Sequence, residues 1–238
     1  MNLDDLKIKI YSDGADKASM LSMAKNPLVK GLTTNPSLMK KAGVSDYPTF
    51  CKEILSQIQD KPISFEVFAD DFAQMKRQAM EIKGWGKNVY VKIPITNSHA
   101  ESCLPLIDEL AHSGVSLNVT AVMTVGQAKS ACEVLKGGAP SILSVFAGRI
   151  ADTGRDPMPI MLASLDLCRS SGRTTELLWA STRESFNIVQ ADQMGCDIIT
   201  VPFDIIKKLN LFGKDLSELS LDTVKAFKAD ADQAGFHL

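Results

Sequence analysis

The sequence predicts an α/β protein folded as a single (β/α)₈ TIM barrel. Short apolar runs alternate with amphipathic helical runs eight times along the 238 residues, without a linker or a low-complexity break, and this alternation favours a parallel sheet. Eight such units in about 200 residues favour a closed barrel over an open sheet. An open sheet would place a glycine-rich phosphate loop after the first strand, and Asp13-Gly14-Ala15-Asp16 is not one.

The predicted strands are apolar, β-branched runs that end at polar or turn-forming residues. They lie at residues 7–13, 29–35, 62–68, 89–95, 115–122, 141–148, 176–181 and 198–202. The carboxyl ends of all strands of such a barrel meet at one face, where catalytic groups sit.

Helices are predicted between the strands from apolar residues spaced three and four apart. In residues 46–59, for example, Phe50, Ile54 and Ile58 fall on one face. Gly114 is typical of a helix C-terminus. The predicted helices are residues 46–59, 70–82, 99–112, 125–135, 159–169 and 184–194.

One more amphipathic helix, residues 217–234, follows the eighth unit and carries Leu221, Val224 and Phe227 on its apolar side. The barrel is already closed without it. We therefore predict one domain over residues 1–238, in which 215–238 form either a cap on the same barrel or an arm that contacts a neighbouring subunit.

Composition excludes several classes of protein. Lys and Arg number 26 against 28 Asp and Glu, for a net charge of −2. The sequence has no basic stripe of the kind that would indicate binding to nucleic acid. Five cysteines without C-x-x-C spacing indicate a reducing compartment rather than disulfides or a zinc site. The N-terminus has no signal pattern, and no apolar run approaches the ~20 residues that span a bilayer. We expect a soluble cytoplasmic protein with no membrane partner.

A lysine stands in the middle of the apolar strand 89–95. Lys92 should point into a packed interior, where a charge is costly. Burial disfavours an ammonium and frees a neutral amine that can attack a carbonyl. The stretch therefore predicts a Schiff-base lysine. The alternative is a lysine on an edge strand, or one whose charged end reaches solvent.

Polar side chains recur near the carboxyl ends of the other strands. With a period of two, Asn118 and Thr120 share one face, and so do Ser144, Phe146 and Gly148. If these faces point inward, the polar groups converge on one pocket around the lysine. They are Asp13, Thr33, Asn35, Glu66, Asn118, Thr120, Ser144, Arg149, Ser181 and Arg183.

Each of these residues also has an ordinary structural interpretation. Asp13 is typical of a turn, and Asn35 before Pro36 is typical of a turn or a helix cap. Arg149 and Arg183 could each form a surface ion pair. Because polar residues recur at the same place on several independent strands, the sequence favours a shared active site over separate structural roles.

The most specific motifs resemble the transaldolase family, class I aldolases that work through a Schiff-base lysine. The resemblance runs from Asp13 to about Leu209. Its motifs are Gly31-Leu32-Thr33-Thr34-Asn35-Pro36-Ser37-Leu38, Val91-Lys92-Ile93-Pro94, Asn118-Val119-Thr120, Ser144-Val145-Phe146-Ala147-Gly148-Arg149-Ile150, Ala180-Ser181-Thr182-Arg183 and Ala191-Asp192-Gln193-Met194-Gly195-Cys196-Asp197.

The resemblance implies roles for the polar residues. Lys92, Asp13, Glu66 and Thr120 would be catalytic. The substrate-binding residues would be Asn35, Thr33, Asn118, Ser144, Phe146, Arg149, Ser181 and Arg183. No cofactor and no metal are implied, and His99, His112 and His237 lie far apart in sequence. Similarity to the short branch of the family implies a ring-like homo-oligomer, a decamer, with the C-terminal helix as the arm.

Two positions separate transferases from fructose-6-phosphate aldolases in that branch. The aldolases carry glutamine and tyrosine where this chain has Glu66 and Phe146. The resemblance therefore implies a transaldolase of the pentose phosphate pathway. Such an enzyme moves a dihydroxyacetone unit from sedoheptulose 7-phosphate or fructose 6-phosphate to glyceraldehyde 3-phosphate or erythrose 4-phosphate.

Three alternatives remain open: a fructose-6-phosphate aldolase, a transaldolase for an unusual donor such as a sulfonated ketose phosphate, and a non-enzymatic sugar-phosphate binding module. Two departures from the family concern the substrate. Thr182 replaces a common phenylalanine, and Trp179 replaces a small residue. We expect Trp179 to fill the barrel floor or else to narrow the pocket.

Overall fold

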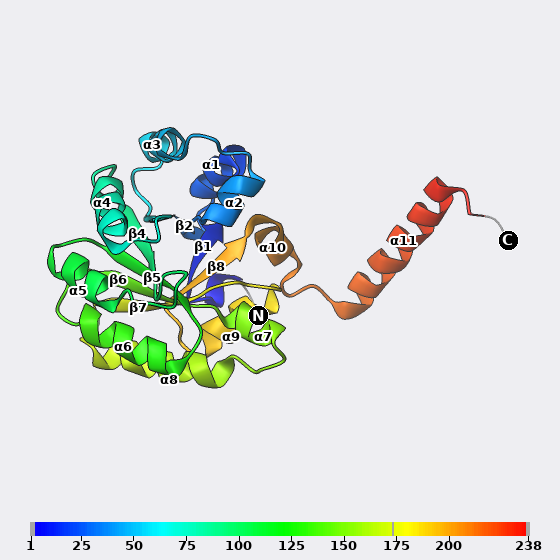
Figure 1. The fold of residues 1–238 in the computed structure, drawn as a ribbon. Coiled ribbons are helices and arrows are strands. Elements are labelled where there is room, and N and C mark those ends of the chain that lie inside the picture. The colour runs from blue at the N-terminus through cyan, green and yellow to red at the C-terminus, as the bar shows by residue number, and fades with distance from the viewer. Residues whose placement is uncertain (1–2, 173, 237–238) are drawn as a thin grey trace.

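A computed structural model describes residues 3–172 and 174–236. In these ranges eight parallel strands close into one barrel in chain order, with helices around it (Figure 1). The predicted fold class is confirmed. The strands are β1 (Lys9–Asp13), β2 (Val29–Thr33), β3 (Ile63–Glu66), β4 (Val89–Pro94), β5 (Leu117–Val122), β6 (Ser141–Val145), β7 (Thr175–Trp179) and β8 (Ile198–Pro202).

Helices connect the strands, and the predicted ones are present, residues 125–135 with the predicted boundaries and the others with shifted boundaries. They are α3 (Tyr47–Gln57), α4 (Phe72–Lys83), α5 (Leu104–His112), α6 (Val125–Leu135), α8 (Met158–Ser170), α9 (Phe186–Gln193) and α11 (Leu216–Ala234). The sequence analysis missed α1 (Lys17–Lys25), α2 (Pro36–Lys41), α7 (Ala147–Asp152) and α10 (Phe203–Lys207), and two 3₁₀ turns, η1 (Leu3–Asp5) and η2 (Lys208–Leu211).

Two of the missed helices begin at ordinary capping residues. Asp16 accepts a hydrogen bond from the Ser19 main-chain nitrogen at 2.8 Å and starts α1. Asn35 accepts one from the Leu38 nitrogen at 3.0 Å, and Pro36 fills the first position of α2. A polar cap satisfies an otherwise unpaired N–H, and proline has no N–H to satisfy there. Asn35 is therefore a cap, as the alternative interpretation held.

The predicted strand 141–148 is too long, because the chain leaves the sheet at Phe146 and enters α7. Gly148 is therefore helical, and its assignment to one strand face with Ser144 and Phe146 is wrong. The predicted helix 99–112 also begins late. Ala100 has a φ of 62°, and a bridge between Thr96 and Ser102 precedes α5.

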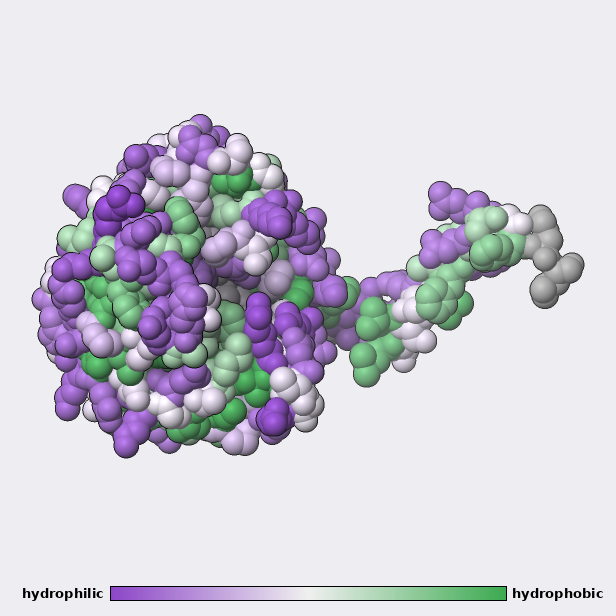
Figure 2. All heavy atoms as spheres, viewed as in Figure 1, coloured by the Kyte–Doolittle hydropathy of each residue, from purple (hydrophilic) through white to green (hydrophobic). Residues whose placement is uncertain are grey.

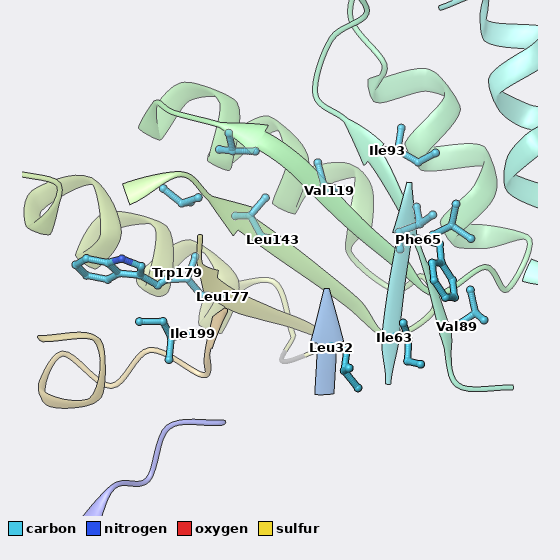
Figure 3. Packing of buried hydrophobic residues seen from close by; sticks show 14 of the residues in the cluster. Leu32, Ile63, Phe65, Val89, Ile93, Val119, Leu143, Leu177, Trp179 and Ile199 are labelled. Atoms are coloured by element: carbon cyan, nitrogen blue, oxygen red, sulfur yellow. The ribbon is translucent and has the colours of Figure 1, made fainter. Parts of the chain in front are cut away.

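The strands have two different faces. Side chains that point out of the barrel pack against the helices and form the main apolar core (Figure 3). A separate small cluster, which includes Tyr11, Leu178 and Ala180, lies inside the barrel.

Trp179 belongs to the outer layer and lies beside Leu177 and Ile199 in Figure 3. It is 1 % exposed, so it neither fills the barrel floor nor narrows the pocket, and both expectations were wrong. That expectation assumes that Trp179 and Ser181, two residues apart, lie on the same face of a regular strand. However, β7 ends at Trp179, and Ser181 has a φ of 62°, so alternation does not continue between them.

The last helix, α11, points away from the barrel (Figure 1). No residue of α11 is buried, and Leu216, Val224 and Phe227 are exposed. Figure 2 shows hydrophobic residues along this projecting segment. It therefore does not pack as a cap on its own barrel. Among the described helices, none is both long enough and apolar enough to cross a membrane.

Candidate active site

A cavity of about 590 Å³ opens at the carboxyl ends of the strands. The twelve residues that the sequence analysis selected all line it, so the structure brings the whole predicted set together. They are Asp13, Thr33, Asn35, Glu66, Lys92, Asn118, Thr120, Ser144, Phe146, Arg149, Ser181 and Arg183.

A row of three polar residues crosses the cavity on adjacent strands. Glu66 on β3 pairs in register with Lys92 on β4, which pairs with Asn118 on β5. The lysine is 6 % exposed. Its Nζ donates to the Thr34 carbonyl oxygen at 2.8 Å and lies 3.2 Å from Glu66 Oε2. Lys92 is therefore an inward-facing residue of a closed barrel and not an edge-strand residue.

The Tyr47 hydroxyl from α3 fixes the position of Glu66. It donates to the Glu66 carbonyl oxygen and accepts from the Glu66 nitrogen, both at 2.9 Å. The ring packs edge-on against Phe68 and lies near Trp85, and burial raises the pKa of the phenol. The sequence analysis missed Tyr47, because its contact is with the backbone of a residue far away in the chain.

Asp13 ends β1 at the cavity wall and is held by a chain of hydroxyl groups. Thr33 Oγ1 donates to Asp13 Oδ1 at 2.8 Å and also contacts Thr200 Oγ1. Since one hydroxyl has one proton, Thr200 must be the donor to Thr33. Burial raises the pKa of the Asp13 carboxyl above its usual value, although Lys92 and the Thr33 hydrogen bond oppose this. Asp13 is therefore suited to take up a proton.

Asn118 and Ser144 form one connected group on the far wall. Ser144 Oγ donates to Asn118 Oδ1 at 2.6 Å, and Asn118 Nδ2 donates to Ser64 Oγ at 3.0 Å. These bonds fix the amide and leave one of its N–H groups for a ligand. Thr120 Oγ1 is buried and has no hydrogen-bond partner within the described ranges. A buried hydroxyl without a partner is costly, and a bound water or ligand would satisfy it.

The rim of the cavity carries the arginines. The Arg149 guanidinium lies over the Phe146 ring, 5.6 Å from its centroid. Arg183 forms an ion pair with Asp152, in which Nε donates to Oδ1 at 3.0 Å and Nη2 donates to Oδ2. The surface ion pair considered for Arg183 is therefore present, but it stands at the cavity.

Asp152, Thr200 and Thr182 also line the cavity and were not selected as site residues. Thr182 Oγ1 donates to the Thr200 carbonyl oxygen at 2.8 Å. Asp152 lies three residues after Arg149 on a helix that the sequence analysis did not predict, and helical spacing alone would have placed the two on one face.

No group of three or more His, Cys, Asp or Glu residues within 3–172 and 174–236 is arranged to hold a metal ion. His99 contacts Asp70, and His112 contacts Asp108, on the surface. His237 lies outside the described residues. The cavity thus combines a buried amine, the carboxylates of Asp13, Glu66 and Asp152, several hydroxyl and amide groups, and two arginines at its rim. These are the groups that an imine-forming reaction on a sugar phosphate needs.

Comparison with known proteins also relates this chain to aldolases that act on sugar phosphates. Residues 10–238 match the family described as Transaldolase/Fructose-6-phosphate aldolase. A probable transaldolase of Dehalococcoides mccartyi is 35% identical over 202 residues, which are 85% of this chain and 90% of that protein. A probable transaldolase of Thermoanaerobacter sp. is 32% identical over 231 residues, or 97% of this chain and 100% of that protein.

A solved structure supports the fold alone. The dihydrodipicolinate synthase of Rhodopseudomonas palustris is 12% identical to this chain, with a TM-score of 0.55 over 93% of this chain and 80% of the other. The family match covers nearly the whole chain and every residue that lines the cavity. This chain therefore belongs to the transaldolase/fructose-6-phosphate aldolase family.

Proposed function

We propose that this protein is a transaldolase that works through a Schiff base on Lys92. The observation that carries the proposal is the position of the amine. Lys92 Nζ is buried at the mouth of a closed barrel, 3.2 Å from the Glu66 carboxylate and in register with Asn118. A carboxylate at that distance can accept the proton that the ammonium must lose before the nitrogen attacks a carbonyl.

The first half of the reaction makes and uses the imine. Lys92 attacks the keto carbon of a ketose phosphate, and a water held between Glu66 and Thr120 moves the protons while the carbinolamine loses water. The Thr120 hydroxyl, which has no hydrogen-bond partner among the described residues, supports this role. Asp13 then takes the proton of the C4 hydroxyl. The electrons of the C3–C4 bond move toward the iminium nitrogen, and an aldose phosphate leaves.

The second half reverses these steps with another aldehyde. The three-carbon enamine stays bound to Lys92, with its hydroxyls held by Asn35, Asn118 and Ser144. It attacks the carbonyl carbon of the acceptor, Asp13 returns its proton to the new hydroxyl, and water releases the ketose product. Arg149, Arg183 and Ser181 bind the phosphate, because guanidinium forks match phosphate oxygens.

Phe146 favours transfer over release of free dihydroxyacetone. Its ring lines the cavity and lies under Arg149. A phenyl ring has no proton to give to the enamine, so the intermediate survives until an acceptor arrives. The donors would be sedoheptulose 7-phosphate or fructose 6-phosphate, and the enzyme would act in the pentose phosphate pathway.

Product analysis tests this proposal. The purified protein receives fructose 6-phosphate with and without erythrose 4-phosphate. We expect sedoheptulose 7-phosphate only when the acceptor is present, and little free dihydroxyacetone without it. Dihydroxyacetone that accumulates without acceptor at the rate of transfer would make the protein a fructose-6-phosphate aldolase. Turnover of a sulfonated ketose phosphate with no turnover of either sugar phosphate would identify an unusual donor.

We further propose that α11 is an arm that packs on a neighbouring copy in a ring-like homo-oligomer, a decamer. The exposed apolar residues Leu216 (77 %), Val224 (59 %) and Phe227 (68 %) support an intermolecular contact, because monomers rarely leave such a stripe unpacked. Light scattering of the full chain tests it. A decameric mass is expected, with dissociation by Val224→Glu, and a monomeric mass would contradict the proposal.

A further inference from the structure

The rim of the cavity carries its own carboxylate between its two arginines. Arg149 and Asp152 both belong to α7, three residues apart, and lie on one side of that helix. Arg183 reaches Asp152 from the segment after β7. All three residues line the cavity.

A close backbone approach brings these two segments together. The Gly148 nitrogen donates to the Ala180 carbonyl oxygen at 3.3 Å. A Cβ atom on Gly148 would lie 1.6 Å from the Ser181 carbonyl oxygen, so only glycine fits. Ser181 itself has a φ of 62°. The main chain therefore brings the segments that carry Asp152 and Arg183 close together.

Stability does not explain this pair. The side chains of Arg183 and Asp152 are 50% and 52% exposed, and an ion pair in that setting is screened by solvent and contributes little to folding. What the pair does provide is orientation. Two parallel N–H···O bonds from one guanidinium to one carboxylate fix the plane of the guanidinium.

The geometry also leaves part of the guanidinium free. Asp152 takes Nε–H and one N–H of Nη2. Arginine has five N–H donors, so both donors of Nη1 and the second donor of Nη2 remain. The hydrogen bond and charge of Arg183, with a further effect of Arg149, lower the pKa of Asp152. The carboxylate therefore stays ionised at neutral pH.

We propose that Asp152 is a positioning residue for phosphate recognition: it holds Arg183 by its Nε–Nη2 edge so that the Nη1 edge, together with Arg149, binds the phosphate of the substrate. The inference rests on the proposed function, which assigns the phosphate to these arginines. In this arrangement the phosphate binds without displacing Asp152. The opposite arrangement, in which Asp152 occupies the phosphate's place and competes with it, predicts the opposite effect of removing the carboxylate.

Binding of fructose 6-phosphate to a Lys92→Met protein tests the idea without catalysis. Titration calorimetry gives the Kd in this background, and then with Asp152→Ala or Asp152→Asn added. We expect Asp152→Ala to raise the Kd about fivefold, the upper range for an exposed pair with good geometry, and Asp152→Asn to raise it less. A lower Kd would show that Asp152 competes with phosphate, and an unchanged Kd would show that it does not position Arg183. Either result overturns the inference.

A matched control separates the effect from a general loss of surface charge. Glu109 forms a comparable exposed pair with Lys76, in which the carboxylate is 50% exposed. We expect Glu109→Ala to leave the Kd unchanged. In otherwise wild-type protein, Asp152→Ala should raise KM for fructose 6-phosphate with a smaller effect on kcat. Equal losses in both would indicate a structural role and count against positioning.

The inference and the proposed function fail in different ways. If borohydride traps no substrate on Lys92 but the Kd still rises with Asp152→Ala, the Schiff-base function fails and the positioning role stands. If trapping succeeds and the Kd does not rise, the positioning role alone fails. A Lys92→Met protein that binds no fructose 6-phosphate overturns the phosphate subsite itself.

Discussion

Within residues 3–172 and 174–236, a lysine–glutamate pair stands at each end of the barrel. Lys92 and Glu66 form the pair at the carboxyl ends of the strands, where the side chains are only 7% and 17% exposed. Lys9 and Glu176 form the pair at the amino ends, where they are 46% and 35% exposed. The residue types are the same, so the difference lies in the surroundings.

The neighbours of the two pairs decide what each can do. Asp13, Asn118 and Thr120 line the same cavity as Lys92. Near the other pair stand Tyr11 and Tyr90, and burial, with a smaller effect of Glu176, raises the pKa of each phenol. A lysine inside a barrel is therefore no sign of catalysis by itself. Burial together with acids, amides and hydroxyls around one amine is the informative pattern.

The largest expected effect is the difference in kcat between substitution of Lys92 and substitution of Lys9. Lys92→Met should lower kcat by about four orders of magnitude or more, because no other group can form the imine. Lys9→Met should leave kcat nearly unchanged and cost less than about 1 kcal/mol of stability, since its ion pair is exposed. Steady-state kinetics and urea unfolding measure both. Comparable activity losses in the two variants would contradict the distinction between the two ends.

The next effect concerns Asp13, the buried carboxyl that lines the same cavity as Lys92. Asp13→Asn should lower kcat by about 10²- to 10⁴-fold, because it removes the proton acceptor but keeps the shape. In the wild type, kcat should fall as pH drops through the raised pKa of Asp13, and so at a higher pH than the ordinary value of 3.8 suggests. The pH–rate profile measures this.

The raised pKa of Asp13 also predicts how Asp13→Asn changes the stability of the fold at different pH values. Below pH 3.8 the Asp13 carboxyl is protonated in the folded and unfolded chains alike. As pH rises, the unfolded chain ionises first and the folded state loses relative stability. Asp13→Asn should therefore be more stable than the wild type at neutral pH and gain nothing near pH 3. A variant that is less stable at neutral pH would show that the ionised carboxylate is favourable in the fold.

A third prediction compares the stability cost of alanine at two glycines, Gly148 at the rim of the cavity and Gly126 on α6. Gly148→Ala should cost about 3 kcal/mol of stability, because its Cβ would lie 1.6 Å from the Ser181 carbonyl oxygen. Gly126→Ala on α6 is the matched control, since its Cβ would come no closer than 3.9 Å to Thr124 Oγ1. Thermal unfolding compares them. If both alanines are tolerated equally, the close approach of Gly148 in α7 to Ser181, after β7, does not hold the rim of the cavity in place.

The smallest expected effect concerns Tyr47. Tyr47→Phe leaves the Glu66 N–H and C=O without their shared partner, which should cost about 1–3 kcal/mol and lower kcat through a misplaced Glu66. Tyr90→Phe, at the other end of the barrel, should leave kcat almost unchanged. A Tyr47→Phe enzyme with normal kcat would show that the strand alone places Glu66.

The sequence was sufficient for the barrel and for twelve residues of its cavity, but not for Asp152 or Thr200. Strand period and strand-end position put Asp13, Lys92 and Thr120 on inward faces. Closure of the sheet into a barrel then brings these side chains into one cavity. Short helices in the loops were harder to predict. The helices α2 and α7 have only six residues each, which is too few to show a helical period, although Asn35 and Pro36 do form a start signal.

Local backbone geometry accounts for the errors at the cavity. Ser181 has a φ of 62°, a conformation that residues other than glycine rarely adopt. A serine at this position does not indicate such a conformation. Parity arguments therefore failed at Trp179, and the partner of Arg183 could not be foreseen, because Asp152 reaches it only through the turn at Phe146.

The most direct test is to trap and map the covalent intermediate. The protein is incubated with fructose 6-phosphate, reduced with borohydride, digested and examined by mass spectrometry. We predict a reduced sugar-derived adduct, three-carbon after cleavage, on Lys92 and none on Lys9. Turnover without any adduct, or an adduct confined to another lysine, would contradict the claim that the buried amine beside Glu66 carries the reaction.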